Sequence, residues 1–139
     1  MKNPISKQIF NHLEYLGYTV EDVTEKENKV NLDFIVGKSE TKSNLLVRIS
    51  PDNTILISAR YVLSDSNKLV TEKFLKTLNT LNSISIHTKV YYQEQDNKEV
   101  SLAMETFIIN YDKLSFTTVI DALESDMRLS LTQLREFYS

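Results

Sequence analysis

The chain has 139 residues and a formal net charge of −3, with 41% of its residues hydrophobic and 25% charged. This size leads us to expect that residues 1–139 fold as a single domain. The negative charge argues against a general nucleic-acid binder, whose affinity depends on neutralised phosphates, and the absence of cysteine excludes disulfides and thiolate metal sites.

The first predicted element is a helix over residues 4–16. Asn3 can cap it. Pro4 suits the first helical position because an N–H group there would have no acceptor within the helix. Gly17 can end the helix in a left-handed backbone conformation. The apolar stripe of this helix consists of Ile5, Ile9, Leu13 and Leu16.

Three strands are predicted next, over residues 30–36, 44–50 and 54–62, because apolar and polar side chains alternate in each. A tight turn at Pro51 joins the second strand to the third, which makes an antiparallel meander. Residues 18–26 either lengthen the first strand or add a turn. The side chains expected to face the core are Val30, Leu32, Phe34, Val36, Leu45, Val47, Ile49, Ile55, Ile57, Ala59 and Tyr61.

The second half of the chain predicts a helix, a hairpin and a long final helix. The helix begins near Asp65 or Ser66 and ends around Asn82. The hairpin strands cover residues 86–94 and 99–109, and the final helix covers residues 112–138 with a bend at Ser130. The hairpin side chains expected to face the core are Val90, Tyr92, Val100, Leu102 and Met104. The whole order is α-βββ-α-ββ-α, an α+β fold with a twisted five-stranded antiparallel sheet and helices packed on one face.

One local stretch carries a resemblance to a known family. A helix that ends in Leu78, Asn79, Leu81 and Asn82, then a hairpin and an apolar helix, is similar to the pattern of the YbjN-like family of proposed bacterial sensory transduction regulators. The order of elements also resembles the fold of class I type III secretion chaperones. The resemblance covers nearly the whole chain. It implies a non-enzymatic binding domain that forms homodimers, and in the chaperones such a domain holds an extended segment of a client protein. It implies no catalytic residue.

Residue patterns for catalysis are missing from the sequence. It has no glycine-rich phosphate loop, no G-x-S-x-G and no H-E-x-x-H. His12 and His87 are the only histidines, and a metal site would require them to converge with a carboxylate, so ordinary boundary histidines are the favoured interpretation. We therefore predict that the protein is not an enzyme and holds no cofactor and no metal.

Two further expectations concern location. No stretch reaches the ~20 apolar residues of a membrane span, and the first residues contain no continuous apolar run of a signal peptide. We expect a cytoplasmic bacterial protein that does not act at a membrane.

The face of the sheet opposite the core is more apolar than a solvated face requires. Tyr, Phe and Arg are enriched in protein–protein interfaces, which makes this face a candidate for binding another protein. Scattered apolar residues on a sheet face are also ordinary, and the final helix could cover this face instead. The candidate binding residues are Ile35, Leu46, Arg48, Leu56, Arg60, Lys89, Tyr91 and Phe107. On the same face, Asp33, Arg48 and Arg60 are expected to form a cross-strand charge ladder.

The leading functional hypothesis is a chaperone-like module that holds a client or partner protein on this sheet face, as a homodimer. A regulatory or sensory adaptor that binds a folded partner is the first alternative. A small-ligand-binding protein or an enzyme with an unrecognised pocket is the second, and it would require a concave site with convergent polar groups.

Overall fold

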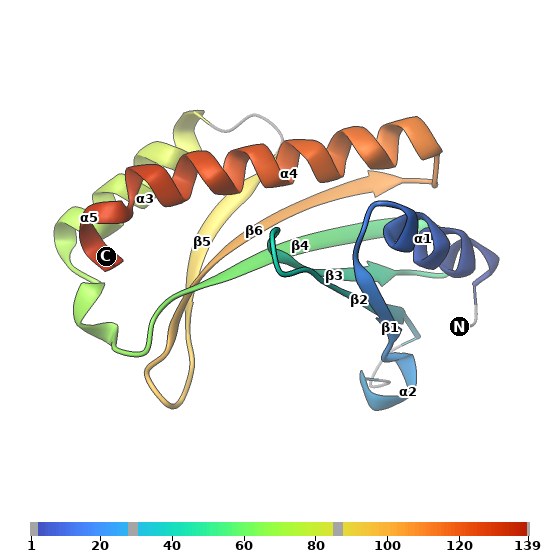
Figure 1. Ribbon diagram of the computed structural model, residues 1–139, viewed down its shortest axis with the longest axis horizontal. Helices are drawn as coiled ribbons and strands as arrows, with labels where there is room; N and C mark the ends of the chain where they lie inside the picture. The colour runs from blue at the N-terminus through green and yellow to red at the C-terminus, as the bar shows by residue number, and fades with distance from the viewer. Residues whose placement is uncertain (1–2, 28–30, 85–87, 139) are drawn as a thin grey trace.

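The computed structural model describes residues 3–27, 31–84 and 88–138. A six-stranded antiparallel sheet lies at its centre, in the strand order β1-β2-β3-β4-β6-β5 (Figure 1). The strands are β1 (Thr19–Asp22), β2 (Asp33–Lys38), β3 (Asn44–Ile49), β4 (Thr54–Ser64), β5 (Lys89–Glu94) and β6 (Val100–Ile109). The helical elements are α1 (Pro4–Tyr15), α2 (Thr24–Glu27), the 3-10 helix η1 (Asn67–Leu69), α3 (Glu72–Ile84), α4 (Lys113–Gln133) and α5 (Arg135–Tyr138).

Helices α1, α3 and α4 cover one face of the sheet. Figure 1 shows α4 running along β6 with α3 beside it, and α1 at the other end of the sheet. Their buried side chains join those of the strands in one core, because each helix presents an apolar stripe to the sheet. The largest fully buried side chains include Ile9 and Leu13 of α1, Phe74 of α3, and Phe116 and Ile120 of α4. The predicted α+β fold with helices on one face of an antiparallel sheet is confirmed at this level.

The predicted ends of the first helix are also confirmed. The Asn3 side chain accepts a hydrogen bond from the Ile5 amide, which caps α1, and Pro4 occupies the first turn. Gly17 has a φ of 98°, in the left-handed region that glycine adopts without strain. The second predicted helix is divided, since Ser66 caps η1 and α3 begins only at Glu72. The last helix breaks at Leu134 rather than at Ser130.

The prediction of five strands is wrong, because residues 19–22 form a separate edge strand. This strand, β1, pairs antiparallel with β2, from Thr19 opposite Lys38 to Asp22 opposite Ile35. Half of its residues are exposed, so its sequence lacks the apolar face by which longer strands are recognised. The one-turn helix α2 follows it.

The prediction for the orientation of β2 is also wrong. Ile35 and Asp33 are buried on the core face, whereas Phe34 and Val36 are half-buried on the opposite face. Ile35 therefore cannot belong to the candidate binding face. Tyr61, expected in the core, is 43% exposed, and the register of β4 against β6 shifts between Val62 and Ser64. Val30, another predicted core residue, lies outside the described residues.

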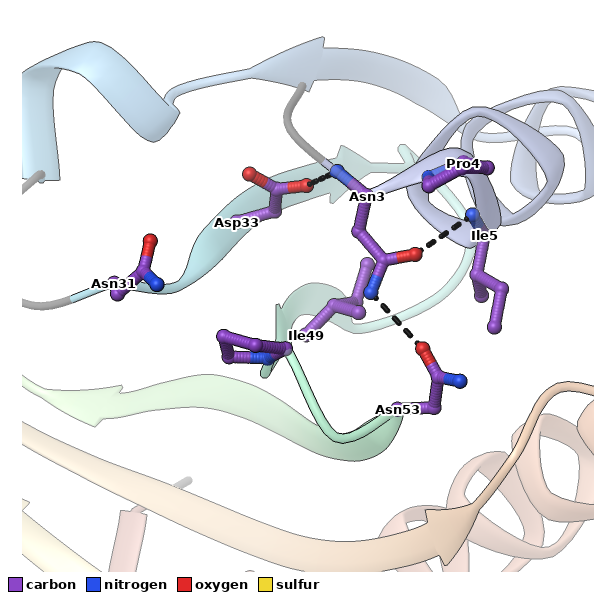
Figure 2. A pocket seen from close by; sticks show the side chains of 8 residues that line it. Asn3, Pro4, Ile5, Asn31, Asp33, Ile49 and Asn53 are labelled. Atoms are coloured by element: carbon purple, nitrogen blue, oxygen red, sulfur yellow. Dashed lines mark hydrogen bonds between the residues drawn. The ribbon is translucent and has the colours of Figure 1, made fainter.

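A buried polar cluster explains why Asp33 faces the core. Its Oδ2 atom accepts hydrogen bonds from the Asn3 amide at 2.8 Å and from Ser6 Oγ at 2.6 Å, and the side chain is 2% exposed. Figure 2 shows the Asn3 amide directed at Asp33 and the Asn3 carboxamide directed at Ile5 and Asn53. A carboxylate at this position holds the first turn of α1 against the sheet, because charge-assisted hydrogen bonds are the strong ones.

A second buried carboxylate ties α4 to the turn between β2 and β3. Glu124 of α4 is 8% exposed, and its Oε1 accepts a hydrogen bond from the Ser43 amide at 3.2 Å. Burial raises the pKa of Glu124 above its ordinary value, while the hydrogen bond from Ser43 and the nearby Lys42 and Arg128 oppose that rise.

This pKa predicts a pH-dependent stability. Since the folded pKa of Glu124 is raised, the folded protein keeps a proton that the unfolded chain has released, and stability falls as pH rises through the interval between the two pKa values. Compared with the Glu124→Gln protein, the wild-type protein should therefore lose stability from about pH 4 upward and then reach a plateau. Urea unfolding of both proteins at a series of pH values measures the difference in their free energies of unfolding. If the two free energies change with pH in parallel, the raised pKa of Glu124 is contradicted.

Within the described residues, no helix combines the length and the apolar character needed to cross a bilayer.

Candidate functional site

Three adjoining hollows lie on the outer face of the sheet, opposite α1, α3 and α4, and at its margins. The central hollow has a volume of about 640 Å³ and is lined by residues of β2, β3, β4, β5 and β6. The helix-side hollow, about 750 Å³, extends past β6 to α4 and shares Glu105 with the central one. The turn-side hollow, about 830 Å³, extends to the β5–β6 turn and shares Asn44 and Arg60 with the central one. We call the three together the outer groove.

Strand register places the predicted binding residues along this groove. In one cross-strand row, Phe34, Arg48, Leu56 and Phe107 stand opposite one another on β2, β3, β4 and β6. In a second row, Leu46 of β3 stands between Val36 of β2 and Ser58 of β4. The row continues with Glu105 of β6, opposite Ser58, and ends with Lys89 of β5, opposite Glu105. In a third, Arg60 and Tyr91 lie on either side of Ala103. Because residues directly opposite across strands share a face, these side chains lie together.

Seven of the eight candidate residues are therefore brought to one face, and Ile35 is the exception. The seven are Leu46, Arg48, Leu56, Arg60, Lys89, Tyr91 and Phe107. Leu46, Leu56 and Tyr91 are half-buried, whereas Phe107 is 61% exposed, which is a large exposure for a phenylalanine. The alternative in which α4 covers this face is not the arrangement observed, since α4 packs on the core side of β6 and β4.

A polar cluster occupies the centre of the groove. Arg48 Nη2 donates to Glu105 Oε1 at 3.2 Å, and the two side chains are 31% and 24% exposed. Burial, together with the neighbouring Glu105 carboxylate, raises the pKa of the Tyr91 hydroxyl. Lys89 Nζ lies 5.8 Å from the centre of the Tyr91 ring, within the range of a cation–π contact.

The expected ladder of Asp33, Arg48 and Arg60 does not form, because Asp33 faces the core. Glu105 takes the place of Asp33 as the acidic partner of Arg48. Sequence reasoning did not identify Glu105 as a site residue. The sequence did contain a signal for it. Glu105 is the one charged residue of β6, and because it directly follows the core residue Met104, it points to the opposite face of the sheet.

A hollow outside the outer groove lies between α1 and the start of α4, with a volume of about 830 Å³. His12 lines it, and its ring nitrogens lie 2.6 Å from Tyr111 Oη and 2.9 Å from Thr117 Oγ1. Burial and the nearby Lys113 lower the pKa of His12. Both nitrogens are thus engaged in hydrogen bonds between α1 and the β6–α4 junction, so His12 acts as a structural link here. His87, the other histidine of the sequence, lies outside the described residues.

Across residues 3–27, 31–84 and 88–138, no group of three or more His, Cys, Asp or Glu side chains is arranged to hold a metal ion. A smaller hollow of about 450 Å³ at the N-terminus of α1 is lined by Asn3, Asp33 and Asn53 (Figure 2). The polar groups of Asn3 there bond to Asp33 and Asn53, which fits a structural role.

Comparison with known proteins places the fold. No family model and no curated protein matches the sequence. The crystal structure of YbjN from E. coli, described as a proposed transcription regulator, is similar with a TM-score of 0.60 and 14% identity, over 94% of this chain and 89% of that one. The crystal structure of an uncharacterized protein from Methanothermobacter thermautotrophicus is similar with a TM-score of 0.72 and 12% identity, over 96% of this chain and 99% of that one. The resemblance to YbjN that the sequence suggested is confirmed for the fold.

Proposed function

We propose that this protein is a non-enzymatic binding module that holds an extended segment of a partner protein in the outer groove. The observation that supports the proposal most directly is the groove itself, in which three hollows follow one another along β4, β5 and β6. A small ligand would fill one hollow, whereas an extended chain suits a row of them. The lining mixes aromatic, apolar and arginine side chains, a composition enriched in the cores of protein interfaces.

The proposal includes the chaperone-like role and the homodimer that the resemblance implies, and the cytoplasmic, bacterial setting expected from the sequence. A homodimer is compatible with a groove on the uncovered sheet face, because the core face is already filled by α1, α3 and α4. Light scattering coupled to size-exclusion chromatography measures the oligomeric state directly.

An experiment on two leucines tests the use of the groove. Leu46 and Leu56 are half-buried in neighbouring rows of the outer face, and aspartate at both positions would put unpaired charges in the proposed interface. We expect the double Leu46→Asp, Leu56→Asp protein to recover its main partner from a lysate of its source cells at least about tenfold less well than wild type. Quantitative mass spectrometry measures the recovery.

The control variant is Leu129→Asp, which changes a 48%-exposed leucine of α4 away from the groove. It should recover the partner as wild type does. Circular dichroism must show all three proteins to be folded. Equal recovery by the wild type, the double variant and the control would refute the groove as the binding site.

A regulatory adaptor that binds a folded partner is the second candidate. It is favoured by the similarity in fold to YbjN, which is described as a proposed transcription regulator. The two candidates differ in the form of the partner: an adaptor would bind the intact folded partner and none of its isolated peptides.

A further inference from the structure

The guanidinium group of Arg48 is only partly bonded within the protein. Nη2 donates to Glu105 at 3.2 Å and lies 3.5 Å from Ser58 Oγ. The Nε atom is buried and has no hydrogen-bond partner among the described residues. A buried N–H group without an acceptor costs free energy, and the arginine fork is shaped to bind a carboxylate through two parallel bonds. Because Nε is enclosed in the protein and the side chain is 31% exposed, a carboxylate from another molecule can reach this arginine at its terminal nitrogens.

The charge of the central hollow favours the same ligand. Arg48 and Arg60 line it, and Glu105 is the only acidic residue among its described lining residues. Lys89 adds a further positive charge on the same face, beside Tyr91. The central hollow is thus positive in a chain whose net charge is −3, although the turn-side hollow also contains Glu40, Asp96 and Glu99. A negative group is therefore attracted to the central hollow.

Arg60 lies close enough to act together with Arg48. Both arginines line the central hollow, and Arg48 Nη2 lies 3.5 Å from the Oγ atom of Ser58, which is two residues before Arg60 on the same face of β4. Arg60 is exposed and forms no ion pair among the described residues, so it remains available to a bound group.

We propose, on the basis of the proposed function, that the bound segment carries an aspartate or glutamate whose carboxylate lies between Arg48 and Arg60. The side chains around this position define its neighbours. Phe34, Val36 and Leu46 line the same hollow. Because side chains on one face of an extended chain recur at every second residue, the residues two positions before and after the acid should be apolar.

A peptide selection tests this inference. Random dodecapeptides displayed on phage are selected on the immobilised wild-type protein, and the best peptide is synthesised with its acid and with the matching amide, Asn or Gln. We expect an acid flanked at every second position by apolar residues. The amide peptide should bind the wild-type protein about tenfold more weakly in fluorescence anisotropy, since a charge-assisted bond is lost.

Two variants locate the carboxylate. Arg60→Gln changes an exposed residue and should reduce binding of the acidic peptide about tenfold while leaving the amide peptide unaffected. Arg48→Lys keeps a positive charge beside Glu105 and removes the fork, so it should weaken the acidic peptide selectively as well. The matched control is Lys73→Gln, which removes an exposed charge of α3 that pairs with Glu136. This control should bind both peptides as wild type does.

The outcomes separate this inference from the function on which it rests. The carboxylate site would be overturned if the selected peptides contained no acid. It would also be overturned if the Arg60→Gln protein bound the acidic peptide and the amide peptide with the same affinities as the wild-type protein does. If those peptides still lose binding in the Leu46→Asp, Leu56→Asp protein, the proposed function stands. If no selected peptide depends on these leucines, both proposals fail.

Discussion

Replacing Asp33 with alanine is expected to lower the free energy of unfolding by about 3–5 kcal/mol. The carboxylate is 2% exposed and accepts hydrogen bonds from the Asn3 amide and the Ser6 hydroxyl, which belong to the first turn of α1. Hydrogen bonds to a charged group contribute about 1.5–3 kcal/mol each, and their removal leaves buried donors without an acceptor. Alanine at this position therefore loosens the attachment of α1 to the sheet.

Urea unfolding followed by circular dichroism measures this effect as a shift of the midpoint. The matched control is Asp121→Ala, which removes an exposed carboxylate from α4. That change should alter stability by no more than about 0.5 kcal/mol. If the midpoint of the Asp33→Ala protein lies within error of the control, the carboxylate does not hold α1 as described.

Replacing Asn82 with alanine is expected to lower the free energy of unfolding by about 2–3 kcal/mol. The Asn82 carboxamide bonds both main-chain groups of Val90, donating to its carbonyl at 2.6 Å and accepting from its amide at 2.7 Å. Val90 lies on β5, an edge strand of the sheet, so these two groups point away from β6. Without Asn82, an N–H and a C=O on the edge lose their partners.

The same substitution should also promote association of the protein with itself. An uncovered strand edge is a template for pairing with another chain, and Asn82 blocks part of this edge. Size-exclusion chromatography at low and high protein concentration, together with urea unfolding, measures both effects. Asn79→Ala is the control, since Asn79 lies exposed on the same helix. Wild-type stability and elution for the Asn82→Ala protein would contradict the role assigned to this side chain.

The sequence predicts those parts of the fold that local patterns control. The capping of α1 by Asn3 and the faces of β3 and β4 up to Ala59 depend on neighbouring residues and on strict alternation, and they are confirmed. The face of β2 was predicted wrongly because Phe34 and Val36 are more apolar than Asp33 and Gly37. The polar residue is buried because α1, far away in the sequence, supplies its hydrogen bonds.

The candidate site was predictable as a face but not as a cluster. Alternation alone places Leu46, Arg48, Leu56 and Arg60 on one side of β3 and β4. The pairing of Arg48 with Glu105 requires β6 to lie next to β4, whereas β5 comes first along the chain. Strand order of this kind depends on the packing of α3 and α4 and has no local signature.

The strand order also divides the sheet into two parts. Strands β1 to β4 pair in sequence as a meander, β5 and β6 pair as a hairpin, and the ladder between β4 and β6 connects the two units within the sheet. The ion pair between Arg48 and Glu105 joins one unit to the other. A partner that contacts both arginines and the β6 side of the groove would therefore clamp the two units together. Binding and unfolding of this protein would then be thermodynamically linked, so that each increment of partner affinity also raises the melting temperature of the protein.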